Sequence, residues 1–268
     1  MMRYKLIIEY DGTNYSGWQK QDGRLTIQET LEDCVFNLTK EKVEVIASGR
    51  TDAGVHAINQ VIHFDLNKEY KTDTIIQGLN FYLGDKNRNL IKLWQKNSND
   101  IFLKPFLQQD IAVKSCEIVN EDFHARFSSK MRHYRYVILN RQRPSALWQN
   151  KVWHIRKELD IEQMQLASAI LLGKHDFSSF RDSQCQALSP VKTMSAIKIY
   201  KQDEFVNFEF SAKSFLHHMI RNIVGTLRDV GTGKTTIKSF EDILNSKDRQ
   251  MAGEMAPACG LYLLGVDY

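Results

Sequence analysis

The 268-residue chain contains few cysteines, and they lie far apart in the sequence. Cys34, Cys116, Cys185 and Cys259 form no CxxC pair, which excludes a zinc ribbon and a disulfide-rich scaffold. Widely spaced thiols are typical of a reducing compartment. Long apolar runs are also lacking, and the N-terminal stretch reaches Glu9 before the apolar region of a signal peptide can form. These absences predict a cytoplasmic protein without a membrane span.

Sequence motifs for bound cofactors are lacking as well. There is no GxGxxG fingerprint, no GxSxG elbow and no cluster of His, Cys, Asp and Glu with metal-ligand spacing. The stretch GTGKTT at 231–236 ends like a phosphate loop, but Arg228 occupies the place of the required first glycine. His217 and His218 are adjacent, so on a helix they point to different sides and cannot chelate one ion. The sequence therefore predicts no metal, nucleotide or redox cofactor.

Acidic residues are absent from one long window, between Phe123 and Lys157. The whole chain carries a formal charge of only +4, so the rest of the chain is net acidic. Cationic side chains contact phosphates, and aromatic faces stack on unpaired bases. A solvated basic face above core aromatics is the simpler alternative, but the length of the window favours nucleic-acid contact. Its basic residues are Arg126, Lys130, Arg132, Arg135, Arg141, Arg143, Lys151, Arg156 and Lys157, interleaved with Phe127, Tyr134, Tyr136, Trp148 and Trp153.

Hydrophobic patterning in the first half of the chain alternates between strands and a helix. Thr26 is expected to start the helix, with Glu29 three residues later completing a capping box. Residues 84–109 are rich in Asn and Lys and show no clean period, so they are interpreted as a loosely ordered insertion. Strands are predicted at 3–10, 43–48, 59–66 and 111–119.

The second half follows a similar plan. Helices are predicted from Asp160 to Gly173, over 214–231 and from Thr236. Strands are predicted at 131–139, 191–200, 204–210 and 260–268. The fold class is therefore α+β: two antiparallel-sheet and helix halves in a pseudo-symmetric arrangement, with a basic cleft between them. The expected domains are residues 1–120 and 121–268.

The stretch GRTDAGVHA at 49–57 places one carboxylate, Asp52, among small residues, Arg50 and His56. It lies on the loop between the strands predicted at 43–48 and 59–66, where a rigid frame can present a polar group. By itself this pattern leaves several readings open, namely a turn, a metal ligand, a relative of a phosphate loop or a catalytic acid. An Asp followed by small residues is most often a turn residue.

Six blocks in order resemble the TruA-type tRNA pseudouridine synthases, and the resemblance spans nearly the whole chain. The blocks are IEYDGTNYSGWQKQ, GRTDAGVHA, DFHARFS with RHYRYVI, HDFSSFR, FLHHMIRNIVGTL and GLYLLGVDY. The resemblance implies an isomerase for tRNA processing that converts uridine to pseudouridine in the anticodon stem-loop, on the 3′ side of the anticodon. It also implies an RNA-binding homodimer that uses no cofactor.

The resemblance assigns roles to five residues. It implies that Asp52 is the catalytic aspartate and that Arg50 helps to displace the target base. Tyr134 would stack on the uracil, Arg221 would pair with the aspartate, and Leu261 would line an apolar pocket. From the acid-free window, Lys130, Arg132 and Arg141 are predicted to contact the RNA backbone.

The expected reaction agrees with these residues. Conversion of uridine to its C-glycoside isomer balances without an oxidant or water, so one ionised carboxylate acting as nucleophile or base suffices. Burial raises the pKa of an aspartate, and a nearby arginine opposes that shift. The alternative function is a non-catalytic tRNA-binding or folding module on the same scaffold.

Overall fold

The computed structural model describes residues 1–97 and 109–268 and divides into two compact units, Met1–Ser129 and Lys130–Tyr268. Both units combine a mainly antiparallel sheet with helices, so the predicted α+β class is confirmed. Short 3₁₀ helices occur at Gly12–Asn14, Ser178–Phe180, Arg249–Met251 and Ala258–Gly260. No helix in the described part of the chain is both long and apolar enough to cross a bilayer.

The division between the units follows Ser129, whereas the sequence suggests a boundary near Asn120. Side chains of the first unit bind the segment in between. The guanidinium of Arg3 donates to the carbonyl oxygen of Phe123 at 2.8 Å, and the amide of Ala125 donates to Nδ1 of His63 at 3.2 Å. These contacts are specified by residues distant in sequence, which explains why local composition does not reveal the boundary.

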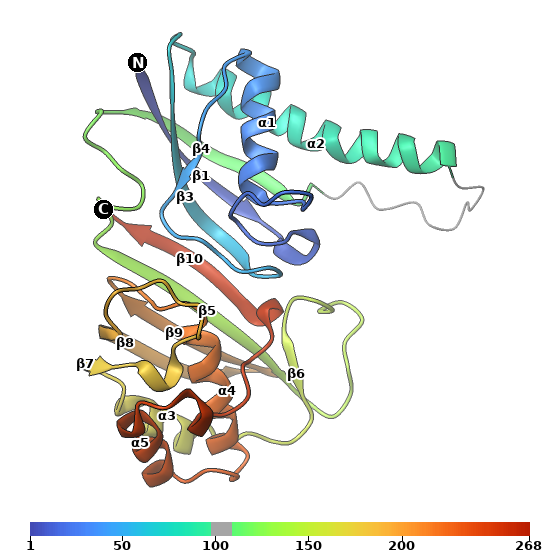
Figure 1. Ribbon diagram of the computed structural model, residues 1–268. Helices are drawn as coiled ribbons and strands as arrows, with labels where there is room; N and C mark the ends of the chain where they lie inside the picture. The colour runs from blue at the N-terminus through green and yellow to red at the C-terminus, as the bar shows by residue number, and fades with distance from the viewer. Residues whose placement is uncertain (98–108) are drawn as a thin grey trace. The chain divides into compact units, whose positions relative to one another are not determined.

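The sheet of the first unit has β1 (Met2–Tyr10) between β3 (His56–Leu66) and β4 (Ile111–Val119), all antiparallel. The short β2 (Ile46–Ala47) pairs with β3. Alternate residues of β1 are buried, as expected for a strand with one face in the core. Helices α1 (Ile27–Thr39) and α2 (Thr72–Asn97) cover one face of this sheet (Figure 1).

Two predictions about the helices of the first unit are wrong. Thr26 is the N-cap of α1, but its side chain makes no capping hydrogen bond, and Glu29 pairs instead with Lys20 at 3.3 Å. Residues 84–97, predicted to be loosely ordered, continue α2. Helix propagation adds one hydrogen bond for each residue, and no proline interrupts this stretch. The rest of the predicted insertion, 98–108, lies outside the described residues.

The sheet of the second unit has the order β10-β5-β9-β8-β7. A further short strand, β6 (Trp153–Ile155), pairs in parallel with β5. Helices α3 (Ile161–Ala169), α4 (Met219–Gly231) and α5 (Ile237–Ser246) gather on one face of the sheet (Figure 1). The other strands are β5 (Met131–Asn140), β7 (Gly173–Asp176), β8 (Val191–Gln202), β9 (Phe205–Ala212) and β10 (Leu261–Asp267).

The helices predicted from Asp160 and from Thr236 are present as α3 and α5, and each starts with a side-chain cap. Oδ1 of Asp160 accepts from the amide of Gln163 at 3.0 Å, and Oγ1 of Thr236 accepts from the amide of Ser239 at 3.1 Å. However, α3 ends at Ala169, before the predicted Gly173. Strands β6 and β7 are too short to leave a periodic signal in the sequence.

The helix predicted over 214–231 starts only at Met219. His218 adopts a φ of 60°, a left-handed conformation that interrupts the helix before it. The rings of His217 and His218 consequently stack, with centroids 3.8 Å apart, and do not point to different sides. Nδ1 of His218 lies 2.6 Å from Oδ2 of Asp182, which holds this turn in place.

Candidate active site

Buried hydrogen bonds hold the residues that precede Asp52. Nε2 of Gln60 donates to the carbonyl oxygen of Gly49 at 2.8 Å. The hydroxyl of Tyr10 lies 2.7 Å from Oγ1 of Thr51. Gln60 is fully buried and Thr51 nearly so, which makes these bonds costly to break because a buried polar group would lose its partner. The loop therefore has a fixed path up to the residue before Asp52.

The loop that follows β1 packs directly against the Asp52 loop. The amide of Trp18 donates to the carbonyl oxygen of Thr51 at 2.9 Å. A Cβ on Gly17 would lie 2.8 Å from that same oxygen, and a Cβ on Gly12 would lie 2.0 Å from the carbonyl oxygen of Val55. Only glycine allows such close approach of two backbones. The two glycines of the first resemblance block thus explain how the catalytic candidate is clamped.

Asp52 stands at the start of a turn, as the simplest reading of its sequence suggests. Its carbonyl oxygen accepts from the amide of Val55 at 3.1 Å, and Gly54 takes the positive φ of 76° that the turn requires. The side chain of Asp52 is partly buried, and that of Arg50 is exposed. The turn uses the backbone carbonyl of Asp52, so a turn and a chemical role for the side chain are compatible readings.

Two histidines near this loop have structural contacts. Nδ1 of His56 accepts from the amide of Gly12 at 3.1 Å and lies 3.0 Å from Oδ1 of Asp11. Burial, together with the positive charge of Arg3, lowers the pKa of His63 to about 4. His63 is therefore neutral at pH 7, as its acceptance of a backbone amide requires. Both histidines tie neighbouring segments to β3.

Tyr134 and Leu261 belong to adjacent strands of the second unit. Tyr134 in β5 is opposite Leu263 in β10, and Leu261 is opposite Tyr136. Cross-strand partners share a face, so the four side chains form one apolar surface. Tyr134 is 8% exposed, and its ring meets Phe215 edge to face at 5.2 Å. The structure thus brings two of the predicted substrate-binding residues onto neighbouring strands.

Arg221 lies in the first turn of α4 and is only 8% exposed. Arg221 is therefore not a solvated helix residue. Nε donates to the carbonyl oxygen of Ala256 at 2.8 Å, and the amide of Ala256 donates back to the carbonyl oxygen of Arg221 at 3.1 Å. This reciprocal pair fixes both the side chain and the backbone of Arg221.

Tyr136 is a site-related residue that sequence reasoning missed. Burial raises the pKa of its phenol well above 10, whereas the positive charge of Arg221 acts in the opposite direction. Its hydroxyl donates to the carbonyl oxygen of Pro257 at 2.7 Å. The sequence did contain a sign of this role. Tyr136 is the second tyrosine of HYRY, and because side chains alternate along a strand, it lies on the same face as Tyr134. Tyr136 thus ties the strand that carries Tyr134 to the segment that holds Arg221.

The three basic residues predicted to contact RNA differ in their environments. Lys130 is exposed. Nη1 of Arg132 donates to the carbonyl oxygen of Lys213 at 2.5 Å. Arg141 pairs with Glu204 at 2.7 Å and also donates to two carbonyl oxygens of its own loop, those of Arg143 and Pro144. The charge of Arg141 is therefore largely compensated within the protein.

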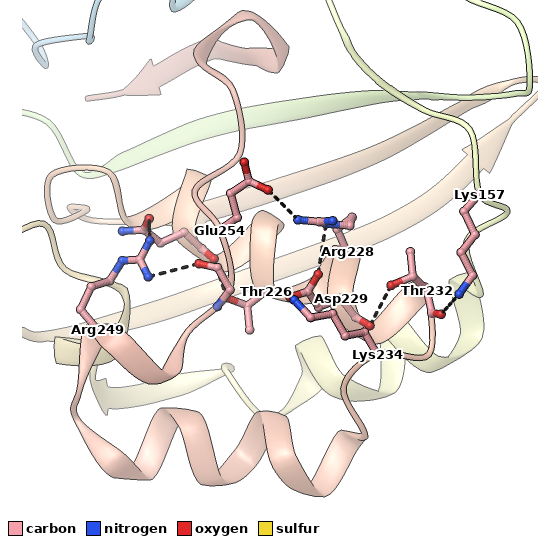
Figure 2. Close-up of polar contacts among 10 residues, drawn as sticks. Lys157, Thr226, Arg228, Asp229, Thr232, Lys234, Arg249 and Glu254 are labelled. Atoms are coloured by element: carbon pink, nitrogen blue, oxygen red, sulfur yellow. Dashed lines mark hydrogen bonds and ion pairs between the residues drawn. The ribbon is translucent and has the colours of Figure 1, made fainter.

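The phosphate-loop-like stretch 231–236 begins at the last residue of α4 and connects that helix to α5. The amides of Gly233 and Lys234 donate to carbonyl oxygens of the last helical turn. These amides are therefore already hydrogen-bonded and are not available to bind a phosphate. Nζ of Lys234 lies 3.0 Å from Oδ2 of the buried Asp229 (Figure 2). The helix extends through Gly231, its C-cap is Thr232, and Gly233 takes the positive φ of 74°.

Comparison with known proteins defines the class to which these two units belong. The sequence profile of the tRNA pseudouridine synthase family matches residues 6–128 and 167–268. The match includes the Asp52 loop, Arg221 and Leu261. The chain belongs to this family and is an isomerase.

Two curated relatives are similar over their full length. The chain is 46% identical over 290 aligned positions to tRNA pseudouridine synthase A of Orientia tsutsugamushi strain Boryong, covering 100% of both chains. It has the same identity and coverage with tRNA pseudouridine synthase A of strain Ikeda. The resemblance to TruA-type enzymes is thereby confirmed.

Proposed function

We propose that this enzyme converts uridine to pseudouridine in the anticodon stem-loop of tRNA, on the 3′ side of the anticodon, with Asp52 as its catalytic carboxylate. Arg50 fills the space left by the displaced base. Tyr134 stacks on the uracil and Leu261 contacts its apolar edge. Arg221 pairs with the ionised Asp52, a pairing that rests on the resemblance to the family.

The observation that carries this proposal is the anchoring of the Asp52 loop. A surface turn has no need of a fully buried glutamine, a buried tyrosine–threonine pair and two glycines at backbone contact distance. A catalytic group does need such support, because reacting atoms must be held within a fraction of an ångström. The same support would be superfluous in a module that only binds tRNA.

The chemistry assigned to the residues balances. The bond between C1′ and N1 breaks, a bond between C1′ and C5 forms, C5 loses its proton and N1 gains one. A stacked uridine must first be flipped out, which costs a few kcal/mol. Stacking on Tyr134 returns about 1–3 kcal/mol of that cost. Asp52 supplies the nucleophile or the base.

The position of the modified uridine can be tested with unmodified tRNA transcripts. Wild-type enzyme should form pseudouridine in a transcript that has uridines on the 3′ side of the anticodon. It should form none in a matched transcript with cytidines at those positions, because cytidine is not an isomer of pseudouridine and cannot give it by rearrangement. Mass spectrometry of nuclease fragments locates the product. Pseudouridine elsewhere would contradict the assigned position, and tRNA binding without any product would favour the binding module.

Binding of tRNA should weaken steeply as salt is added, because each contacted phosphate releases counterions. Lys130→Ala should reduce the slope of log K against log salt by about 0.7–0.9, the value of one phosphate contact. Arg141→Ala is the matched comparison and should change the slope less, because Glu204 already compensates this charge. Filter binding over a salt series measures both slopes. A slope near zero for the wild type would contradict a basic tRNA-binding surface.

We also propose that the enzyme works as a cytoplasmic homodimer that binds tRNA across its subunits. The support is the resemblance to the family, together with the wide spacing of the four cysteines along the sequence. Sedimentation equilibrium tests the oligomeric state directly. A monomer at micromolar concentration would contradict the dimer without affecting the assignment of Asp52.

A further inference from the structure

The segment at 249–257, here called the strap, runs along α4 and ends where Ala256 binds Arg221. Its backbone approaches the helix so closely that a Cβ on Gly225 would lie 1.7 Å from the carbonyl oxygen of Glu254. Arg221 and Gly225 are four residues apart and so lie on one face of the helix. The strap therefore follows the same face of α4 that carries Arg221.

Polar side chains secure the strap to successive turns of α4 (Figure 2). Oγ1 of Thr226 accepts from the amide of Gly253 at 3.0 Å and donates to the carbonyl oxygen of Asn222 at 2.8 Å. Arg249 donates to Oδ1 of Asn222 at 2.9 Å and to the carbonyl oxygen of Gly253 at 3.1 Å. Thr226 is 1% exposed, so its hydroxyl is a buried link between helix and strap.

A second pair of contacts lies at the exposed edge of the strap. Nη2 of Arg228 lies 3.2 Å from Oε2 of Glu254, whose side chain is 78% exposed. An ion pair with one exposed partner contributes little free energy, because water and salt screen it. The guanidinium of Arg228 also lies over the ring of Trp153, 5.1 Å from its centroid. The buried hydroxyl of Thr226 is therefore a firmer anchor for the strap than this ion pair.

The position of the strap determines the direction of the Arg221 guanidinium. A guanidinium is planar, and its donors point in fixed directions within that plane. The bond from Nε to the carbonyl oxygen of Ala256 thus sets where the two Nη groups donate. If the strap moves, the Ala256 carbonyl moves with it, and the fork of Arg221 changes direction.

We propose that Thr226 is a positioning residue for the isomerisation, because its hydroxyl holds the strap that orients Arg221. This inference rests on the role of Arg221 in the proposed function. Thr226 itself touches neither base nor ribose in this scheme. It acts through Gly253 and Ala256, three residues apart on the strap.

The test compares Thr226→Val with Thr226→Ser in single turnovers on an unmodified tRNA transcript. Valine has the same shape as threonine but no hydroxyl, so we expect a rate about tenfold lower with tRNA affinity unchanged. Serine restores the hydroxyl and should restore the rate. Equal rates for valine and wild type, or a loss that serine does not repair, would overturn the proposal.

The same substitution in an Arg221→Lys background separates positioning from general destabilisation. Lysine keeps the charge but has no planar fork for the strap to orient. Thr226→Val should therefore cause no further loss of rate in this background. An equal loss in both backgrounds, or full activity of Arg221→Lys itself, would overturn the proposal. Should Thr226→Val not fold, Arg249→Gln loosens the strap from its other side and must give the same pattern.

Failure of this inference can be told from failure of the proposed function. If the wild type forms no pseudouridine on the transcript, the proposed function fails. If the wild type is active and Asp52→Asn is inactive while Thr226→Val behaves like wild type, only the role of Thr226 fails.

Discussion

Asp52→Asn should lower the rate of pseudouridine formation by about ten-thousandfold or more while leaving tRNA affinity unchanged. Asparagine has the shape of aspartate but cannot act as nucleophile or base. The loop should keep its path, because Gln60 and Trp18 bind backbone carbonyls and Tyr10 binds the side chain of Thr51. Single-turnover assays with no added metal or nucleotide, beside binding titrations, measure the two quantities separately.

Asp203→Asn is the matched control for this substitution. Asp203 is exposed in the turn between β8 and β9 and has a φ of 52°, a conformation that asparagine adopts readily. Its rate and tRNA affinity should equal those of the wild type. Substantial turnover by Asp52→Asn would show that another group performs the chemistry. Loss of tRNA binding in the same variant would show that Asp52 has a structural role.

Gly12→Ala should destabilise the protein by about 3 kcal/mol and also lower the rate of isomerisation. The added Cβ would lie 2.0 Å from the carbonyl oxygen and 2.8 Å from the carbonyl carbon of Val55. Both are backbone atoms, so no rotamer change relieves the clash. The amide of Val55 donates to Asp52, and a shift of this turn therefore displaces the carboxylate. Chemical denaturation measures the free energy of unfolding.

Gly84→Ala is the control for Gly12→Ala in the same unit, and it should raise the free energy of unfolding where Gly12→Ala lowers it. Gly84 lies in α2, and the nearest atom to an added Cβ is Oε1 of Gln109 at 4.0 Å. Alanine in a helix is favoured over glycine by about 0.5–1 kcal/mol, so this variant should be slightly more stable and fully active. Equal stability of Gly12→Ala and wild type would show that the two loops are not in close contact.

Much of the α+β fold was predictable from periodicity and turn residues. Strand β4 coincides with its prediction at 111–119, and α5 starts at Ile237, one residue after the predicted start at Thr236. The errors have local causes. The left-handed His218 interrupts the helix expected from Ser214, and α2 continues through a stretch whose composition suggested a loop. Neither the backbone angle of one residue nor the propagation of a helix is visible in a hydrophobic pattern.

The candidate site was predictable to a different extent in the two units. Asp52 was identified from an ordered set of sequence blocks, and the structure adds the buried contacts that support it. The burial of Arg221 and the role of Tyr136 were not foreseen, because each depends on a segment more than 30 residues away, with Ala256 or Pro257 as the partner. Contacts between residues so far apart in the sequence produce no hydrophobic periodicity from which they could be predicted.

The sequence by itself determined the alternation of strands and helices, the chemical types at the candidate site and the family. These follow from the order of side chains along the chain, which local propensity and motif spacing express directly. Only the tertiary structure decided that Gln60, Gly12 and Gly17 clamp the Asp52 loop, and that the strap orients Arg221 through Ala256. The reason is physical: close packing and buried hydrogen bonds join residues remote in sequence, and their geometry exists only once the chain has folded.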